Sequence, residues 1–444
     1  MRKLENNVMY MKMEFKKGQK IKVDGPASIL VKEGIVWSLG RKISERERIT
    51  IPIAKTVLLE IISDTVAEVS LGENAKIEKI EDPVIPYEWR TAIESIYNDF
   101  KPSKILILGG ANTGKSLFTI HLANYYTSHK EKIGIIDEDL GQSEIGPPTV
   151  ISSTLLTKPI INFFQTKLYD GYFIGTVDPR DVTENILVGV KILSEKLAKE
   201  DLKAVIINTD GWIQGEKARC FKINMINLLK PDIIVAIQRY NELEHIIKAF
   251  ERQRWIQIIR LIAPNILKPR SPELRKLVRE SMYTKYLNNL KILKIDVNKI
   301  PLMFSSYGSS FPLSSKMIEK VRRNIGEEIF SKIEYIGMNS DEIVIVVNDI
   351  NIIEVLRKNF SETFRDKRVR IIRKGDEKGL IVGIYDYYNA FLGIGYIDEI
   401  YYKRGIIKIK ANIPSIDDVG LIYLGQVKLD ERCNEIKRIK MWDL

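Results

Sequence analysis

The chain has 444 residues, of which 45% are hydrophobic and 29% charged, and its formal net charge is +11 at pH 7. This composition excludes a disordered or low-complexity chain, and the length exceeds one compact core, so we expect two or three domains. The positive charge favours a polyanionic partner, with nucleic acid ahead of a membrane surface, although Lys- and Glu-rich surfaces also occur in proteins from hot environments.

The few cysteines and histidines argue against a metal centre built from them. Cys220 and Cys433 lie in unrelated contexts, and the histidines are His121, His129 and His245. We therefore expect neither a disulfide framework nor a zinc site, and a structural role for His121 on its predicted helix. The N-terminal stretch lacks the apolar core of a signal peptide, and no apolar run approaches the ~20 residues that cross a bilayer, so we expect a cytoplasmic protein without a membrane span.

Three regions with different patterns follow one another along the chain. Residues 1–85 carry short β-type runs separated by turns, which predict a small all-β domain. A proline-marked boundary follows, and then a helical pattern that places Trp89, Ile93 and Ile96 on one face. Residues 289–444 return to β-type runs such as "EIVIVVND" and "GLIVGIYDYY", so we expect a β-rich C-terminal domain there.

Residues 86–288 alternate between apolar strands and helices. The predicted strands are "KILILGG", "KIGIIDEDL", "KAVIINTD", "DIIVAIQ" and "IQIIRLI", and helical stretches fall at 115–127, 183–198, 216–229 and 241–252. Continuous apolar strands that alternate with helices are typical of a parallel sheet covered on both faces. The sequence therefore predicts an α/β fold in which a central parallel sheet, flanked by helices, stands between two β-rich domains.

The stretch "GGANTGKS" fits the phosphate-loop (P-loop) pattern G-x-x-x-x-G-K-[ST]. It lies between the strand "KILIL" and the helix "SLFTIHLANYY", and its glycines let successive N–H groups point at phosphate oxygens. Lys115 is expected to reach the β- and γ-phosphates of ATP, and the Ser116 hydroxyl to bind Mg²⁺. A glycine-rich strand–helix turn without a nucleotide is the alternative. The predicted nucleotide contacts are Gly109, Gly110, Ala111, Asn112, Thr113, Gly114, Lys115 and Ser116.

Acidic residues end the next predicted strand, in "IIDEDLGQSEIGPP". The carboxyl end of a parallel strand beside the phosphate loop is where ligands bind in such sheets. One carboxylate there can take a proton from an attacking hydroxyl or orient Mg²⁺. Spacing alone does not choose between Asp137 and Asp139, and a solvated acidic turn is the alternative.

Five motifs give the chain a resemblance to a known family. "GGANTGKS", "DEDLGQSEIG", "YFIGTVDP", "INTDGWIQG" and "RSPELRKLVRE" occur in the order seen in the 5′-hydroxyl polynucleotide kinases of RNA processing. That family includes the kinase associated with eukaryotic mRNA 3′-end cleavage, the nucleolar ribosomal-RNA-processing kinase and archaeal relatives. The resemblance spans all three predicted domains, is strongest from about 104 to 287 and is thin after 300. It implies an archaeal-type member with a central P-loop kinase domain that uses ATP and Mg²⁺.

The resemblance also implies roles for residues of the acceptor site. Asp139 matches the acid that positions or deprotonates the acceptor hydroxyl and helps to bind Mg²⁺, and Gln142 is its companion. In "GTVDP", Thr176 and Pro179 match the clasp that grips the RNA end. The family usually has a serine or threonine before this proline, whereas this chain has Asp178.

Further positions match residues around the terminal base and the nucleotide. Trp212 resembles the tryptophan that packs on the terminal base, a contact that tolerates any base; burial in the core is the alternative. Arg270 and Arg275 match the lid arginines, with Arg279 in support, and a solvated basic helix is the alternative to a lid. Lys55 resembles an N-terminal-domain residue near the nucleotide.

The resemblance implies an ATP-dependent kinase that phosphorylates the 5′-hydroxyl end of RNA, with DNA left open, in RNA processing or repair. Its expected catalytic residues are Lys115, Asp139, Arg270 and Arg275, and its expected partners are RNA 5′ ends and an RNA-processing nuclease or ligase. An ATP-bound, non-catalytic scaffold of an RNA-processing complex is one alternative, and a P-loop ATPase acting on a small molecule or protein is another. The loop lysine, acidic turn and lid arginines favour an enzyme over a scaffold, and the positive charge and tryptophan turn favour the kinase over the ATPase.

Overall fold

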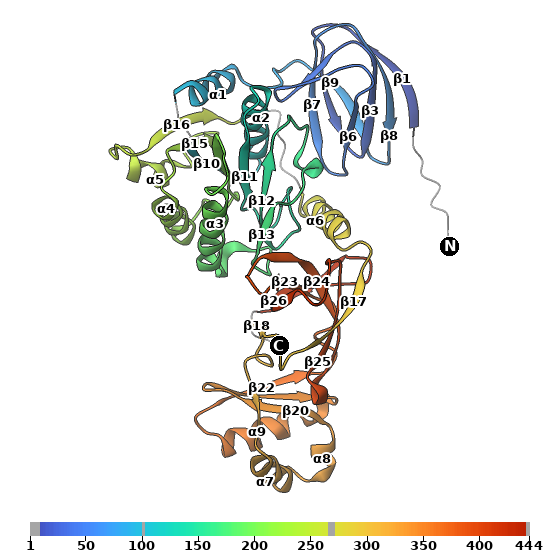
Figure 1. The fold of residues 1–444 in the computed structure, drawn as a ribbon, viewed down its shortest axis with the longest axis vertical. Coiled ribbons are helices and arrows are strands. Elements are labelled where there is room, and N and C mark those ends of the chain that lie inside the picture. The colour runs from blue at the N-terminus through green and yellow to red at the C-terminus, as the bar shows by residue number, and fades with distance from the viewer. Residues whose placement is uncertain (1–8, 100–102, 265–270, 441–444) are drawn as a thin grey trace. The chain divides into compact units, whose positions relative to one another are not determined.

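The computed structural model describes residues 9–99, 103–264 and 271–440. Its described residues divide into two compact units, one within Met1–Ile174 and Asp178–Met282, the other within Gly175–Val177 and Tyr283–Leu444 (Figure 1). The first unit holds the N-terminal strands and the central sheet, and the second holds the C-terminal sheets.

The N-terminal strands form two antiparallel sheets that share one apolar core. Side chains alternate between buried and less buried positions, as in the strand where Ala27, Ile29 and Val31 face inward. Inward-facing residues of both sheets meet in one cluster, which confirms the predicted all-β fold of this region. One sheet has the order β1 (Met9–Phe15), β8 (Thr65–Leu71), β3 (Ala27–Glu33), β6 (Arg48–Ile51), and the other β5 (Arg41–Ile43), β4 (Val36–Ser38), β7 (Thr56–Ile61), β2 (Lys20–Asp24), β9 (Lys76–Ile80).

The central sheet contains the five predicted strands, and these are parallel to one another. Two further strands, β12 and β13, extend one edge in the antiparallel sense, so the sheet is mixed rather than wholly parallel. The sheet order is β13 (Asp170–Phe173), β12 (Val150–Leu156), β11 (Ile133–Asp137), β14 (Ala204–Asn208), β10 (Ser103–Gly109), β15 (Ile233–Gln238), β16 (Gln257–Ile262).

The order of the strands sends the connections after β10 and β14 in opposite directions across the sheet. The chain runs from β10 through α2 to β11 in one direction across the sheet and continues through β12 to β13 at the edge. It then returns through α3 to β14 and through α4 to β15 in the other direction. Right-handed crossovers therefore place α2 on one face and α3 and α4 on the opposite face (Figure 1). Because the loops after β10 and β14 leave toward opposite faces, a ligand can enter between them.

The helices of this unit agree closely with the predicted positions, with one exception. The stretch predicted as a helix at 241–252 forms only the short α5 and a 3₁₀ turn at Lys248–Phe250. The helices are α1 (Tyr87–Asp99), α2 (Lys115–Ser128), α3 (Thr183–Leu197), α4 (Glu216–Leu229), α5 (Glu244–Ile247) and α6 (Pro272–Tyr286), the last of which continues into the second unit.

The N-terminal strands and the central sheet share part of a second core. On α1, Trp89, Ile93 and Ile96 are buried as predicted, and they cluster with Leu39 and Leu58 from the N-terminal strands. A buried asparagine reinforces this junction, because Nδ2 of Asn124 on α2 donates to the Leu39 oxygen and to the Ile160 oxygen, each at 2.7 Å. The predicted structural role of His121 fits this region, since its ring packs edge-on against Trp37 at 5.7 Å.

The C-terminal unit contains two sheets and confirms the predicted β-rich region. The predicted strands "EIVIVVND" and "GLIVGIYDYY" are present as β21 and β23, but the region also carries helices α7, α8 and α9, which were not predicted. The larger sheet has the order β17 (Lys291–Asp296), β25 (Ile406–Ala411), β24 (Phe391–Tyr401), β23 (Leu380–Asp386), β26 (Val419–Leu429), β18 (Leu302–Met303), with β27 (Glu435–Arg438) beside β26. The smaller sheet has the order β19 (Phe311–Pro312), β20 (Ile333–Met338), β21 (Glu342–Val347), β22 (Arg368–Arg373), and packs with α7 (Ser315–Ile325), α8 (Glu327–Ser331) and α9 (Ile353–Thr363).

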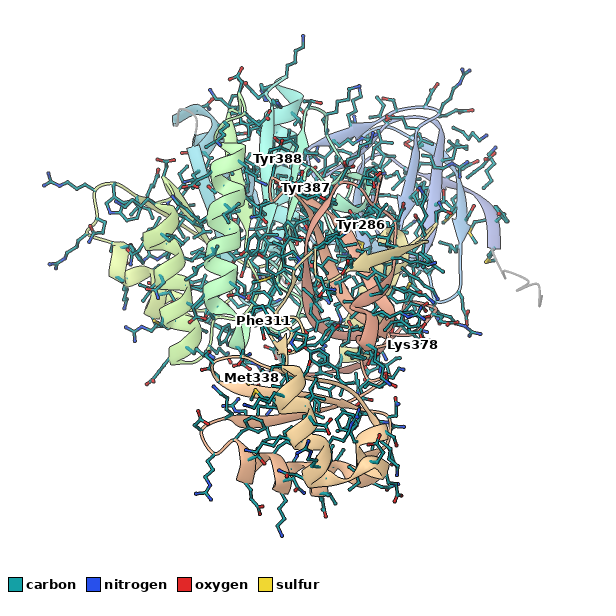
Figure 2. All side chains as sticks on the ribbon, turned by 60° about the horizontal axis from the view of Figure 1, so that its bottom comes forward. Tyr286, Phe311, Met338, Lys378, Tyr387 and Tyr388 are labelled. Atoms are coloured by element: carbon teal, nitrogen blue, oxygen red, sulfur yellow. The ribbon has the colours of Figure 1, made fainter. Side chains whose placement is uncertain are left out.

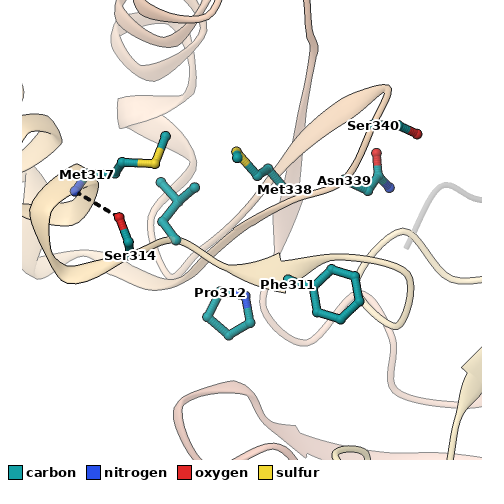
Figure 3. Close-up of a pocket in the computed structure, with 8 residues that line it drawn as sticks. Phe311, Pro312, Ser314, Met317, Met338, Asn339 and Ser340 are labelled. Carbon is teal, nitrogen blue, oxygen red and sulfur yellow. Dashed lines mark hydrogen bonds between the residues drawn. The ribbon is translucent and has the colours of Figure 1, made fainter.

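Two apolar features of the C-terminal unit are open to solvent. The turn between β23 and β24 presents Tyr387 and Tyr388, which are 70% and 93% exposed (Figure 2). Beside the edge strand β19, a groove of about 560 Å³ is lined by Phe311, Met317 and Met338 among others (Figure 3). Within the described ranges, the helices lack the combined length and apolarity needed to cross a bilayer.

Candidate active site

The phosphate loop joins β10 to α2 at the carboxyl end of the central sheet. Asn112 and Gly114 have φ angles of 58° and 97°, so the backbone curls tightly before the helix begins at Lys115. A Cβ atom on Gly109 would lie 2.4 Å from Oγ1 of Thr113, so this position has room only for glycine. The N-cap residue Gly114 brings no side-chain oxygen, which leaves the first-turn N–H groups of α2 to bind an anion.

Lys115 is held inside the loop. Its Nζ donates to the Gly109 oxygen at 2.9 Å and to the Gly110 oxygen at 2.7 Å. Burial lowers the pKa of this lysine to about 8, and the carboxylates of Asp139 and Asp210 oppose that shift. The Lys115 ammonium therefore sits where phosphate oxygens can replace loop carbonyls as its hydrogen-bond partners.

The turn after β14 packs directly against the phosphate loop. Oγ1 of Thr209 donates to the Ile107 oxygen at 2.7 Å, which ties the turn to β10. A Cβ atom on Gly211 would lie only 2.7 Å from the backbone nitrogen of Ala111. The two backbones thus approach as closely as glycine permits, and the turn that carries the tryptophan lies beside the loop.

Trp212 is half-buried in this turn. Its exposure lies between the two predicted alternatives, an exposed ring that stacks on a base and a ring buried in the core. Its ring stacks on the buried Phe221 of α4 with centroids 6.0 Å apart and an interplanar angle of 29°. The backbone N–H of Trp212 donates to Oδ1 of Asp210 at 2.9 Å, which fixes the start of the turn. The indole is therefore supported from within the protein while part of its surface remains accessible.

The acidic turn after β11 places three carboxylates in different surroundings. Asp137 is fully buried: its Oδ1 accepts from Asn208 at 3.0 Å and its Oδ2 accepts the Glu144 N–H at 2.8 Å. Burial, followed by the charge of Asp139, raises the pKa of Asp137 to about 7. Both Asp137 oxygens thus serve the protein's own structure.

Asp139 is the half-buried carboxylate of this turn. Its Oδ1 accepts the N–H groups of Gly141 at 3.1 Å and Gln142 at 2.9 Å. Burial and the charge of Asp210 raise its pKa, while these hydrogen bonds and the charge of Lys115 oppose the shift. Of the two acids that the sequence left open, Asp139 is the one with accessible surface beside the phosphate loop.

The third carboxylate, Glu138, belongs to a buried ion cluster that sequence reasoning missed. Nζ of Lys222 on α4 lies 3.2 Å from Oε2 of Glu138 and 2.8 Å from Oδ1 of Asp210. The available signal was that Lys222 falls on the buried face of α4, beside Phe221 and Met225, where an apolar residue is expected. A lysine at such a position implies buried anionic partners.

Helix α6 carries Arg275 and Arg279, two of the arginines predicted to form or support a lid. Arg275 is half-buried and Arg279 is 9% exposed. The helix touches the acidic turn, because Nε2 of Gln142 donates to the Arg275 oxygen at 3.3 Å as well as to the Gly141 oxygen at 2.6 Å. Arg270, the other predicted lid arginine, lies outside the described residues.

The predicted clasp residues belong to different compact units of the chain. Thr176 is buried in the second unit, and Pro179 opens a 3₁₀ turn in the first. Asp178, the departure from the family pattern, accepts the Arg180 backbone N–H at 3.1 Å and pairs with the Arg180 guanidinium through both carboxylate oxygens. The negative charge of Asp178 is thereby balanced by an adjacent cation.

Lys55 contacts the acidic turn. Its Nζ pairs with Oε1 of Glu144 at 2.5 Å, and both side chains are largely buried. Glu144 is also the residue whose N–H binds Asp137. The N-terminal strands therefore help to hold the acidic turn in place.

Comparisons with known proteins identify similar sequences in archaea. Residues 109–289 match the family model described as the mRNA cleavage and polyadenylation factor CLP1 P-loop. The chain is 29% identical over 356 residues to a polyribonucleotide 5′-hydroxyl-kinase of Methanocaldococcus jannaschii, covering 79% of this chain and 94% of that protein. It is 28% identical over 354 residues to the corresponding kinase of Pyrococcus horikoshii, covering 79% and 93%.

More distant matches extend the comparison to eukaryotes and to solved structures. The polynucleotide 5′-hydroxyl-kinase GRC3 of Saccharomyces cerevisiae is 23% identical over 352 residues, covering 69% of this chain and 55% of that protein. The solved Clp1p–Pcf11p complex matches with a TM-score of 0.65 at 13% identity, over 95% of this chain and 98% of that one, which shows a shared fold. With its ordered motifs and its phosphate loop, the chain is thus similar over most of its length to archaeal P-loop polyribonucleotide 5′-hydroxyl kinases.

Proposed function

We propose that this chain transfers the γ-phosphoryl group of ATP to the 5′-hydroxyl of an RNA end. The observation that carries the proposal is the meeting of three elements at the carboxyl ends of adjacent parallel strands. The phosphate loop follows β10, the tryptophan turn follows β14 and the acidic turn follows β11, and Ile107, Asn208 and Asp137 are in register across these strands. A triphosphate and a hydroxyl acceptor can therefore be held side by side.

In this proposal the loop grips the triphosphate of ATP. N–H groups of residues 110–116 bind phosphate oxygens, and Lys115 exchanges its two loop carbonyls for β- and γ-phosphate oxygens. The buried ammonium gains most from that exchange, because its attraction to phosphate is weakly screened in a site removed from water.

The donor set fits a Mg²⁺ ion bound together with substrate phosphates. Ser116 in the first turn of α2 and Asp139 offer the hard oxygen ligands that Mg²⁺ prefers. Among the described residues, no group of three or more His, Cys, Asp or Glu side chains could hold a metal ion by itself, and Mg²⁺ commonly completes its shell with water and phosphate. When bound, the ion neutralises charge on the phosphate oxygens.

The transfer step itself needs positioning and one proton acceptor. The 5′-oxygen forms its bond to the γ-phosphorus as the bond from that phosphorus to ADP breaks, and the hydroxyl proton passes to Asp139. The raised pKa of Asp139 makes it a better proton acceptor than an ordinary carboxylate. Arg275 and Arg270 neutralise charge that spreads over the transferring oxygens, and Gln142 links the acidic turn to the lid helix.

The RNA end is held by stacking rather than by base-specific contacts. Trp212, backed by Phe221, offers the terminal base a flat surface, and Thr176 and Pro179 form the clasp on the sugar–phosphate chain. Lys55 acts indirectly here, through its ion pair with Glu144. The proposal also includes an RNA-processing nuclease or ligase as partner and a cytoplasmic location. DNA remains an alternative acceptor.

A single labelling experiment tests this function. The protein is incubated with γ-labelled ATP, Mg²⁺ and a 5′-hydroxyl oligoribonucleotide, with a 5′-phosphorylated copy as the matched control substrate. Label on the 5′ end of the hydroxyl substrate alone supports the kinase. ATP that stays bound and unspent supports the scaffold, and hydrolysis independent of RNA supports an ATPase of another kind; either result refutes the proposal. A DNA copy of the oligonucleotide measures the preference between acceptors.

A further inference from the structure

We propose that Lys222 is a positioning residue that sets the spacing between the acceptor acid, Asp139, and the stacking platform, Trp212. The inference rests on the proposed function, because the two residues are taken to hold the hydroxyl and the base of one RNA end. Lys222 lies beneath both turns and is fully buried, so it acts through its neighbours.

The ammonium group joins two turns that are distant in the sequence. It lies 2.8 Å from Oδ1 of Asp210, at the tryptophan turn, and 3.2 Å from Oε2 of Glu138, at the acidic turn. The same Glu138 oxygen accepts the backbone N–H of Asp210 at 2.6 Å. Side-chain exposure is 0% for Lys222 and Glu138 and 9% for Asp210, so water does not compete for these contacts.

Each carboxylate is adjacent to a residue of the proposed acceptor site. Glu138 directly precedes Asp139, and Oδ1 of Asp210 accepts the backbone N–H of Trp212 at 2.9 Å. Lys222 also lies over the ring of Phe221, 4.6 Å from its centroid, and that ring supports Trp212. One side chain thus contacts the supports of the acid and of the indole together.

The energetics of buried ion pairs favour a geometric role over a stabilising one. Desolvation of a buried charge cluster offsets much of its attraction, so apolar residues of similar shape stabilise a core as well or better. Burial acts against the charged form of Lys222, but the two carboxylates outweigh it and raise its pKa, so the ammonium stays charged. A permanent charge between two carboxylates sets their separation more strictly than apolar packing would.

The test replaces Lys222 with methionine, which keeps the length of the side chain and removes its charge. For Lys222→Met we expect KM for a 5′-hydroxyl oligoribonucleotide to rise roughly tenfold, while the Kd for ATP stays within about twofold. The emission spectrum of Trp212 is obtained by subtracting the spectrum of the same protein carrying Trp212→Phe. Without RNA, this spectrum should differ between Lys222→Met and the wild type. Lys191→Met is the matched control, since Lys191 is partly exposed on α3 and pairs with Glu195 along its own helix.

A second variant covers the case in which unpaired carboxylates prevent folding. Lys222→Met combined with Glu138→Gln and Asp210→Asn removes the charges together, and we expect it to fold with the same rise in KM for RNA. A folded variant with wild-type KM and wild-type Trp212 emission overturns the inference, as do equal losses for RNA and ATP. Failure of both variants to fold assigns the cluster to folding and rejects the positioning role. If the wild-type protein does not phosphorylate RNA, the proposed function is refuted. The placement of Trp212 by Lys222 is still tested, because Trp212 emission is measured without RNA.

Discussion

Gly211→Ala puts a methyl group where the tryptophan turn meets the phosphate loop. The added Cβ would lie 2.7 Å from the Ala111 nitrogen and 2.8 Å from its Cα, and backbone atoms cannot rotate away as a flexible side chain can. Gly211 is not among the glycines with a positive φ angle, so the clash is the main cost of the change. Overpacking of this kind costs about 1–3 kcal/mol, which lowers the Tm of a domain of this size by roughly 2–12 °C.

The effect on catalysis should exceed the effect on stability. A shift of about 1 Å between reacting groups can lower a rate about 10²-fold, and the turn or the loop must move to admit the methyl group. We expect a large fall in kcat with a moderate fall in Tm, measured by the labelling assay and by thermal unfolding. Gln214→Ala is the control, because Gln214 is exposed in the same segment. Wild-type kcat and Tm in Gly211→Ala would refute the packing of turn against loop and, with it, the placement of Trp212 beside the ATP site.

Four further predictions address individual side chains. Trp212→Ala should raise KM for RNA roughly 5- to 150-fold, corresponding to about 1–3 kcal/mol of stacking, and Trp212→Phe should raise it less; steady-state kinetics with an unchanged KM in Trp212→Ala would contradict the stacking role. Asp139→Asn should abolish transfer while circular dichroism stays that of the wild type, and retained activity would move the proton acceptor to Asp137. Arg275→Ala should lower kcat far more than ATP affinity measured by titration, and equal losses would count against a lid. The pKa of Asp137 is raised from its ordinary value to about 7, so the folded protein keeps a proton that the unfolded chain has released, and this group lowers stability as pH rises from about 4 to 7. In Asp137→Asn, the free energy of unfolding measured with urea should fall less between pH 5 and pH 8 than in the wild type. An unchanged dependence of this free energy on pH would show that Asp137 is not the group responsible.

Local patterns explain why the phosphate loop was predictable. The phosphate loop is contiguous, because its glycines, Lys115 and Ser116 must follow one another to curl around phosphate. The acidic and tryptophan turns were predictable as the ends of apolar strands, since parallel strands bring their carboxyl ends to one edge. The order of the strands determines where these motifs lie. The alternation of strands and helices leaves only a few possible strand orders.

Non-local contacts explain what sequence reasoning missed. Lys222 and Glu138 are 84 residues apart, and neither carries a local pattern that pairs it with the other. Strand β12 was missed because its centre is polar: Oγ of Ser153 and Oγ1 of Thr154 donate to oxygens of Asp170 and Lys167 across the sheet. Such side chains are compatible with a buried strand only once the neighbouring segment is in place. The different surroundings of Asp137 and Asp139 likewise depend on the hydrogen-bond partners of each carboxylate, which the sequence does not show.

The junction between the N-terminal strands and the central sheet limits how the protein can be dissected. A truncated chain starting at residue 86 would strip Leu39 and Leu58 from the cluster that contains Trp89, and would leave Asn124 without the Leu39 oxygen that it binds. It would also leave the Glu144 carboxylate without Lys55. The first 85 residues thus complete part of the core around α1 and α2 and supply a cation to the acidic turn, so the central sheet is expected to be less stable without them.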